Sequence, residues 1–404
     1  MGAPSMPVSS DLPPLIMGTA TFNSQYNTNP YELPTTELVQ RALSAGICAF
    51  DTSPYYGPAE ELLGKALSTN FVQENYPRSA YRLLTKVGRI ASSTFDYSPA
   101  WIRRSIKRSL SRLGTTYLDV VYCHDVEFVT PEEVLGAVQE LRKIRDTDGT
   151  IHYVGISGYP VDVLCSLAEM VLEKTGEPID IVMSYANFTL QNTLLATKGL
   201  ERLIAAGVDC VLNASPLGMG LLRRNGVPIG SMGDFHPAPN ELREAIQKAS
   251  LWTEEQGEKI EVVAIRYALE NWLHVGAAVG ALGLPTAAQA IGTGTSSATA
   301  LHRLGGSVMG VSNIAELEET MRVWKVILDA LPSESVNLQC REGHVVLDED
   351  QKLPESQRIQ TLTKGIRDIL GDKWVDFVWA SPDADYVNTP IPGHPPPVED
   401  GSSR

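Results

Sequence analysis

The sequence predicts a closed (β/α)8 barrel, the TIM barrel, followed by an extra segment at the carboxyl end. Short apolar runs alternate with helical patterns eight times, and the connections between them are short. Alternation of this kind implies a parallel sheet covered by helices, and eight units favour closure into a barrel over an open sheet. No Gly-x-Gly-x-x-Gly motif follows an expected strand, so a Rossmann-type domain lacks its fingerprint.

The strands are expected where apolar, β-branched residues end in a polar or small residue. These segments are 15–20, 47–51, 81–87, 118–124, 153–158, 179–185, 208–214 and 305–311. Helices are expected where apolar residues recur every three or four positions, at 35–45, 60–67, 99–113, 132–145, 161–174, 194–206, 240–256, 261–272, 314–331 and 355–370. Ser98-Pro99 is a helix-start signal and Gly114 is a stop signal.

The barrel is expected over residues 12–331, with two irregular parts. Residues 276–306 are rich in Gly, Ala, Ser and Thr without a clear period, which predicts a flexible insertion. The insertion precedes a strand, so we expect it on the face opposite the active site. We expect 332–381 to form an extension that folds across the barrel mouth, and the proline-rich 382–404 to be disordered.

Composition excludes several classes of function. The 404 residues carry a net charge of −15 with the acids spread along the chain, which argues against nucleic acid and membrane-surface partners. The five cysteines lack metal-site spacing, so we expect no metal and buried thiols in a reducing compartment, the cytoplasm. Neither a signal peptide nor a membrane span is indicated. We expect a small-molecule enzyme that is a monomer or a weak homo-oligomer.

Four polar residues stand at or just after the ends of three successive expected strands: Asp51, Tyr56, Lys86 and His124. The carboxyl ends of barrel strands face one mouth, so these four residues, called the tetrad below, should form one cluster. The combination suits proton transfer at a carbonyl, because an ammonium held by a carboxylate should lower the pKa of a neighbouring phenol. Each residue alone also has a structural explanation: a strand-end ion pair, a packed ring or a core histidine.

The motif Phe50-Asp51-Thr52-Ser53-Pro54-Tyr55-Tyr56-Gly57, with Lys86 and His124 after their strands, resembles the aldo-keto reductase family. The resemblance implies that the tetrad is catalytic and that a nicotinamide dinucleotide binds at the mouth. It also implies cofactor contacts from the first strand end, from Asp51, from the residues that hold the carboxamide, from the loop that wraps the pyrophosphate, and from the adenosine end. Gly18 and Thr19 stand at the first strand end, next to Asp51 in the predicted mouth, and Ser157 and Gly158 would hold the carboxamide. Ser215, Pro216 and Leu217 belong to the pyrophosphate loop, and the adenosine end comprises Gly310, Ser312, Glu316 and Glu319.

Within that family, segments 214–222 and 236–239 look like a branch that oxidises D-arabinose and L-galactose. This resemblance implies oxidation of an aldose at C1 to the aldonolactone by hydride transfer, with Tyr56 as acid–base group. The alternatives are an NAD(P)H-dependent aldehyde or ketone reductase, and a non-catalytic barrel that senses cofactor and regulates a partner.

Two positions depart from the family pattern. Ala214 stands where many members place a tyrosine against the nicotinamide, so another aromatic is expected there: one from the long loop, Trp374 or Trp379. Gly310 and Glu316 stand where NADPH-using members carry cations. A phosphate beside a carboxylate and without cations is disfavoured, so we expect NAD as the preferred cofactor and NADP as the alternative.

Overall fold

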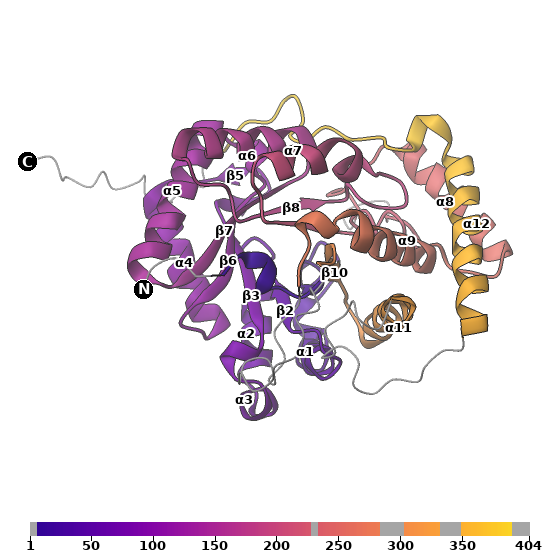
Figure 1. The fold of residues 1–404 in the computed structure, drawn as a ribbon, viewed down its shortest axis with the longest axis horizontal. Coiled ribbons are helices and arrows are strands. Elements are labelled where there is room, and N and C mark those ends of the chain that lie inside the picture. Colours follow the sequence, from indigo (N-terminus) through magenta and orange to yellow (C-terminus); the bar gives the residue numbers. More distant parts are fainter. Residues whose placement is uncertain (1–5, 228–232, 283–302, 332–348, 390–404) are drawn as a thin grey trace, which may run out of the picture.

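Eight parallel strands close into a barrel in the computed structural model, which describes residues 6–227, 233–282, 303–331 and 349–389. The predicted barrel is therefore confirmed (Figure 1). Strand β1 pairs with β2 on one side and with β10 on the other, which leaves the sheet without an edge. The strands are β1 (Leu15–Gly18), β2 (Ala49–Asp51), β3 (Arg82–Val87), β6 (Leu118–His124), β7 (Ile151–Gly158), β8 (Ile181–Tyr185), β9 (Cys210–Ala214) and β10 (Gly306–Gly310).

Helices surround the barrel on its outer side (Figure 1). They are α1 (Thr35–Ser44), α2 (Ala59–Leu67), α3 (Asn70–Asn75), α4 (Pro99–Leu113), α5 (Pro131–Asp148), α6 (Val161–Thr175), α7 (Leu200–Ala205), α8 (Asn240–Glu255), α9 (Ile260–Val275), α11 (Ile314–Ala330) and α12 (Glu349–Trp374). A small hairpin, β4 (Arg89–Ala91) and β5 (Thr94–Phe95), follows β3. None of the described helices is both long enough and apolar enough to cross a membrane.

The residues that were expected to start and end α4 do so. The side chain of Ser98 accepts a hydrogen bond from the backbone N–H of Trp101, and Pro99 occupies the first turn. Gly114 ends the helix in the left-handed conformation with φ 63°. These local choices set the length of α4 and hence where the chain re-enters the barrel as β6.

The apolar core has two layers around the sheet. Side chains such as Ile16, Leu84 and Leu212 fill the barrel interior, and a larger layer packs between the strands and the helices. Val8 and Leu12 belong to the interior layer, so the amino-terminal segment closes the amino end of the barrel. The carboxyl ends of the strands remain as the end where a site can form.

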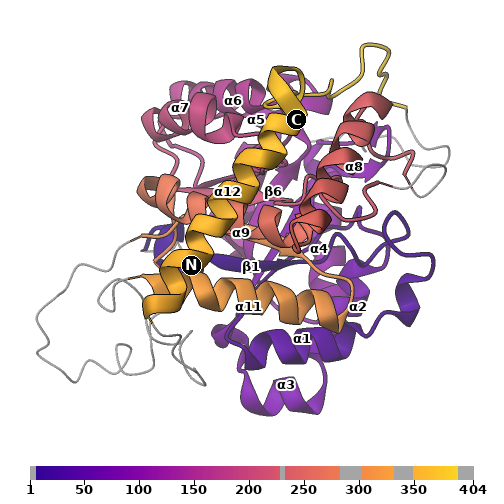
Figure 2. The same cartoon turned by 90° about the vertical axis from the view of Figure 1, so that its right-hand side faces the viewer.

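The extension packs along two barrel helices. Helix α12 contains the expected helix 355–370 and lies beside α8 and α9 (Figures 1 and 2). Gly365 allows the close approach, because a Cβ at this position would lie 2.1 Å from the ring of Trp252. After α12, the indole of Trp379 stacks on Tyr159 at a centroid distance of 4.6 Å. The chain therefore returns from α12 toward the carboxyl end of β7.

The expectation of disorder over 382–404 is wrong for its first part. Asn388 exchanges two 2.9 Å hydrogen bonds with the backbone of Phe95, and Tyr386 packs edge-on against Phe128. Composition alone missed these contacts because the partner hairpin is nearly 300 residues away in the sequence. Residues 390–404 lie outside the described residues.

Most of the expected insertion, 283–302, also lies outside the described residues. Its two ends meet in a bridge between Ala281 and Leu304, and the N–H of Leu282 donates to the carbonyl of Ser9. Because Ser9 belongs to the segment that closes the amino end, the ends of the insertion lie opposite the mouth.

Candidate active site

A cavity of about 830 Å³ opens at the carboxyl ends of the strands. It contains the whole tetrad and most of the residues assigned to the cofactor. The predicted cofactor residues that line it are Gly18, Asp51, Ser157, Ser215, Pro216, Leu217, Gly310, Glu316 and Glu319. Three others lie behind this wall. Thr19 is hydrogen-bonded to the carbonyl of Asp51, Gly158 lies against Glu127, and the backbone of Ser312 donates to Glu316.

A buried ion pair forms the base of the site. The Lys86 ammonium donates to both carboxylate oxygens of Asp51, at 2.7 and 2.9 Å, and to the carbonyl of Thr52 at 2.9 Å. Lys86 and Asp51 are 1% and 3% exposed. Burial raises the pKa of Asp51, and the ammonium of Lys86 opposes that shift. The tight pairing satisfies all three ammonium protons within the protein.

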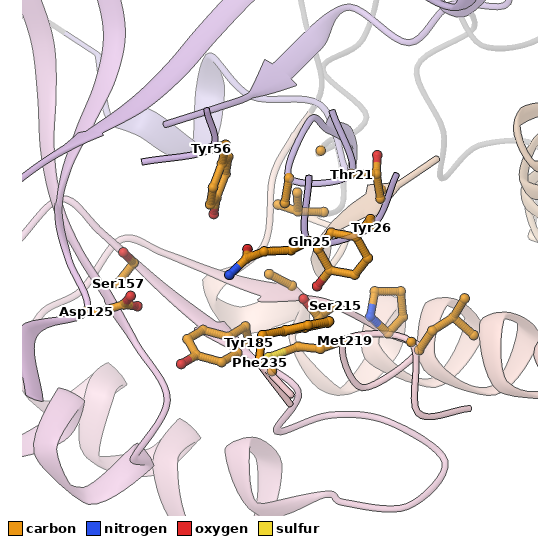
Figure 3. A pocket seen from close by; sticks show the side chains of 18 of the residues that line it. Thr21, Gln25, Tyr26, Tyr56, Asp125, Ser157, Tyr185, Ser215, Met219 and Phe235 are labelled. Atoms are coloured by element: carbon orange, nitrogen blue, oxygen red, sulfur yellow. The ribbon is translucent and has the colours of Figure 1, made fainter. Parts of the chain in front are cut away.

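Tyr56 lies over this ion pair and beside His124. The Lys86 nitrogen is 4.8 Å from the centre of the Tyr56 ring, and the His124 ring meets it edge-on at 5.6 Å. Among the described residues, no hydrogen bond joins the Tyr56 hydroxyl to Lys86 or His124. The side chains of Tyr56, Asp125 and Tyr185 are directed toward the same part of the cavity (Figure 3). A substrate oxygen placed there would lie within reach of both the phenol and the imidazole.

The expected lowering of the Tyr56 pKa is not found in the protein alone. Burial, with the carboxylates of Asp51 and Asp125, raises the pKa of Tyr56 well above its ordinary value, and Arg89 opposes the shift. The physical reason is that Asp51 already neutralises Lys86, so the phenol experiences an ion pair rather than a free cation. Tyr56 is therefore a neutral phenol at neutral pH.

A second ion pair, which the sequence analysis did not single out, lines the cavity next to His124. The guanidinium of Arg89 donates to the carboxylate of Asp125 and lies over the Tyr55 ring, 3.9 Å from its centre. Asp125 has the left-handed φ of 54°, which is uncommon for an aspartate and turns the chain directly after β6. Burial opposes ionisation, but the guanidinium of Arg89, through its charge and its hydrogen bond, holds the pKa of Asp125 below its usual value. The sequence signal that could have revealed Asp125 is its position directly after His124.

Several aromatic side chains lie near Ala214, the position where many family members place a tyrosine against the nicotinamide. Ala214 pairs with Tyr185 on the adjacent strand, and Tyr185, Phe235 and Trp379 all line the cavity. Phe235 comes from the long loop and Trp379 from the extension, which are two of the sources expected to supply the aromatic; that either covers the nicotinamide stays a prediction. Trp374 is not among the lining residues; it packs edge-on against Phe377 instead.

The far end of the cavity carries a cation that the sequence analysis missed. Arg223 lines this end and forms a 2.7 Å ion pair with Glu316. The second oxygen of Glu316 accepts the N–H of Ser312 at 2.7 Å. The expected absence of cations around Glu316 is therefore wrong. The loop after β9 brings Arg223 next to Glu316, although the two residues are 93 positions apart in the sequence.

The loop after β9 turns tightly beside the cavity, and its residues test whether a dinucleotide fits here. Ser215, Gly218, Met219 and Gly220 all have positive φ, between 56° and 93°. The N–H groups of Gly218 and Gly220 donate to the carbonyls of Ser215 and Leu217, so those two amides are satisfied within the turn. Ser215, Met219 and Gly220 line the same cavity as the tetrad and Arg223, and Figure 3 shows Ser215 and Met219 at its wall. A dinucleotide fits the residues present, because this loop and the Arg223 cation line the same large cavity as the tetrad.

Comparison with known proteins agrees with this geometry. The model of the family described as "Aldo/keto reductase family" matches residues 14–337. The chain is 42% identical to D-arabinose 1-dehydrogenase of Saccharomyces cerevisiae over 268 residues, which are 66% of this chain and 78% of that protein. It is 35% identical to L-galactose dehydrogenase of Arabidopsis thaliana over 196 residues, 48% of this chain and 58% of that protein.

A more distant relative and a solved structure extend the comparison. L-glyceraldehyde 3-phosphate reductase of Escherichia coli K12 is 30% identical over 151 residues, 36% of this chain and 41% of that protein. The structure of the glycerol dehydrogenase AKR11B4 from Gluconobacter oxydans superposes with a TM-score of 0.55 at 18% identity and covers 96% of both chains. At that identity the superposition supports the barrel fold alone.

Proposed function

Because this chain belongs to the aldo/keto reductase family of oxidoreductases, we propose that it oxidises an aldose at C1 to the aldonolactone with NAD. The observation that carries the proposal is the buried pair of Lys86 and Asp51 against the Tyr56 ring, inside a cavity that His124 also lines. Two sugar dehydrogenase relatives support an aldose of the D-arabinose or L-galactose type as the substrate.

In the proposed reaction, a bound nicotinamide supplies the acceptor for the hydride that leaves C1. Tyr56, as phenolate, removes the proton from the C1 hydroxyl, so that C1–O becomes the carbonyl of the lactone. Lys86 stabilises the phenolate through space, and Asp51 keeps the ammonium in place. His124, which is neutral because burial lowers its pKa to about 3, donates a hydrogen bond to the same oxygen.

The residues at the far end support a preference for NAD. Glu316 and Glu319 both line the cavity there, and Glu316 neutralises Arg223 through their 2.7 Å ion pair. A 2′-phosphate would have to displace Glu316 from Arg223 and remain beside two carboxylates, whereas ribose hydroxyls can donate to those carboxylates. NADP is the alternative because Arg223 is present.

One observation favours the reverse reaction, reduction of an aldehyde or ketone. The raised pKa of Tyr56 keeps its hydroxyl protonated in the protein alone, and reduction requires a protonated group that can donate to the carbonyl oxygen. Rates in both directions decide between the two, and binding of cofactor without turnover would instead indicate a regulatory barrel.

We also propose that the extension 332–381, of which residues 332–348 lie outside the described residues, covers the mouth. The support is that Trp379 and Ser381 line the same cavity as Tyr56. Reduced thiols at Cys123, Cys165 and Cys210 are compatible with a cytoplasmic enzyme.

The test is a substrate screen that follows NADH absorbance. D-arabinose, L-galactose and simple aldehydes are offered with NAD or NADP, and the aldehydes are also offered with each reduced cofactor. We expect the largest kcat/KM for an aldose with NAD. A larger value for aldehyde reduction, or turnover of no aldose, would overturn the proposed function.

A further inference from the structure

The hydroxyl of Ser53 lies between a backbone amide and the imidazole of His124. The backbone N–H of Tyr55 donates to Ser53 Oγ at 3.1 Å, and Ser53 Oγ is also 3.1 Å from His124 Nδ1. Ser53 is fully buried and His124 is 5% exposed. This contact is independent of the ion pair between Lys86 and Asp51.

Counting donors and acceptors assigns the proton on the imidazole. The Tyr55 amide can only donate, so Ser53 Oγ accepts from it and keeps one hydrogen to give. His124 Nδ1 is the remaining partner of that hydrogen among the described residues. If Nδ1 itself carried a proton, the Ser53 hydrogen would be buried without an acceptor, which is costly. Nδ1 is therefore the acceptor, and the proton of the neutral ring lies on Nε2.

The surroundings of the ring agree with a neutral Nε2–H tautomer. Lys86 and Arg89 disfavour a second proton on the ring, and Asp125 favours it. Nε2 is 3.6 Å from Asp125 Oδ2, which already accepts from Arg89. The remaining close aromatic neighbours are Tyr55 and Tyr56, which meet the ring edge-on. The Nε2–H group is thus available to a ligand oxygen in the cavity.

We propose that Ser53 is a positioning residue that fixes His124 as the Nε2–H tautomer and so makes it the hydrogen-bond donor to the reacting oxygen. The proposal rests on the proposed function, because it assigns the donor in that same reaction. Without the Ser53 hydroxyl, part of the His124 population adopts the Nδ1–H form, whose Nε2 presents a lone pair to the substrate oxygen and cannot donate.

The protein contains its own reference for this tautomer. His236 Nε2 is 2.9 Å from the carbonyl of Gly218, which can only accept, and its Nδ1 accepts the N–H of Ala238 at 3.1 Å. Burial lowers the pKa of His236 to about 4, so this ring is neutral at pH 7. Backbone groups alone therefore hold His236 as Nε2–H, and no substitution at Ser53 alters them.

The experiment measures imidazole 15N shifts at pH 7 in the full chain, with His124→Gln used to assign the signals. We expect His124 and His236 to show the same Nε2–H pattern in the native protein. In Ser53→Ala, the two nitrogen shifts of His124 should move toward each other while those of His236 stay fixed, and kcat should fall by about tenfold. Ser53→Thr, which keeps a hydroxyl, should restore both readouts.

Ser250→Ala is the matched control. It removes another buried hydroxyl, which lies on α8 and donates to the backbone carbonyl of Arg224, and should change neither readout. An Nδ1–H pattern in the native protein, or unchanged His124 shifts in Ser53→Ala, would overturn the proposal. The shifts need no turnover, so absence of aldose oxidation would refute the proposed function while the tautomer assignment is judged separately.

Discussion

Lys86→Met tests whether the buried ion pair holds the site together. Methionine has a similar length and no charge, so the substitution leaves the Asp51 carboxylate in a place where it is 3% exposed and loses its two hydrogen bonds from the ammonium. Removing one partner of a buried pair costs about 3–5 kcal/mol of unfolding free energy. For a chain of 404 residues, whose unfolding entropy is about 2.1 cal/mol/K per residue, that loss corresponds to a fall in Tm of roughly 4–6 °C.

The loss of stability in Lys86→Met should depend on pH, and the direction of that dependence can be worked out. Without Lys86, burial raises the pKa of Asp51 further above its unfolded value. A carboxyl whose folded pKa is raised stabilises the fold below its unfolded pKa, about 3.9, and that contribution is lost as the pH rises through the folded value. The difference in Tm between native protein and Lys86→Met should therefore be smallest at acid pH and largest at neutral pH.

Two further variants make the result interpretable. Lys86→Met combined with Asp51→Asn removes both charges and should recover most of the lost stability while aldose oxidation stays abolished. Lys364→Met breaks an exposed pair with Asp368 and should cost less than about 1 kcal/mol. Thermal unfolding followed by circular dichroism measures all of them. A single variant as stable as the native protein, or a double variant no more stable than the single one, would refute the reasoning.

Three other substitutions test separate parts of the site. Tyr56→Phe should reduce turnover by at least about 10³-fold while NAD still binds, as measured by fluorescence titration, and retained turnover would exclude Tyr56 as the acid–base group. Burial and Asp125 raise the pKa of Glu127 to about 8, so its stabilising contribution is present below its unfolded pKa and is lost as the pH rises to about 8. The Tm should accordingly fall less between pH 5 and 8 in Glu127→Gln than in the native protein, and equal falls would contradict this. Glu316→Gln frees Arg223 and should raise kcat/KM with NADP about tenfold relative to NAD, whereas Glu318→Gln, on the outer side of the same helix, should not; parallel changes in the two variants would rule out a role for the ion pair in cofactor choice.

The parts of the site that the sequence predicted are those fixed by strand periodicity. Lys86 and His124 are placed by the regular strands on which they lie, so alternation along each strand and the common direction of barrel strands bring them to one mouth. Asp51 and Tyr56 follow from the same rule and from the short loop between them. The fold was predictable for this reason as well.

The parts that the sequence did not reveal depend on where loops and the extension meet. Arg89 pairs with Asp125 through the hairpin after β3, and Arg223 reaches Glu316 from the long loop after β9. Trp379 reaches Tyr159 across 220 residues. No local period links such positions, because each contact depends on the path of a loop rather than on the repeat of an element.

The charge balance around Tyr56 leads to a last prediction. Lys86 is neutralised by Asp51 and Arg89 by Asp125, so the phenol lies between two ion pairs and its pKa is raised rather than lowered. Formation of the phenolate then needs a further positive charge nearby, which the oxidised nicotinamide ring carries and the reduced ring lacks. Ultraviolet titration of the native protein, with Tyr56→Phe subtracted, should therefore give a lower Tyr56 pKa with NAD⁺ bound than with NADH bound. Equal values would mean that Lys86 suffices after all, and that the oxidised ring has no part in making Tyr56 acidic.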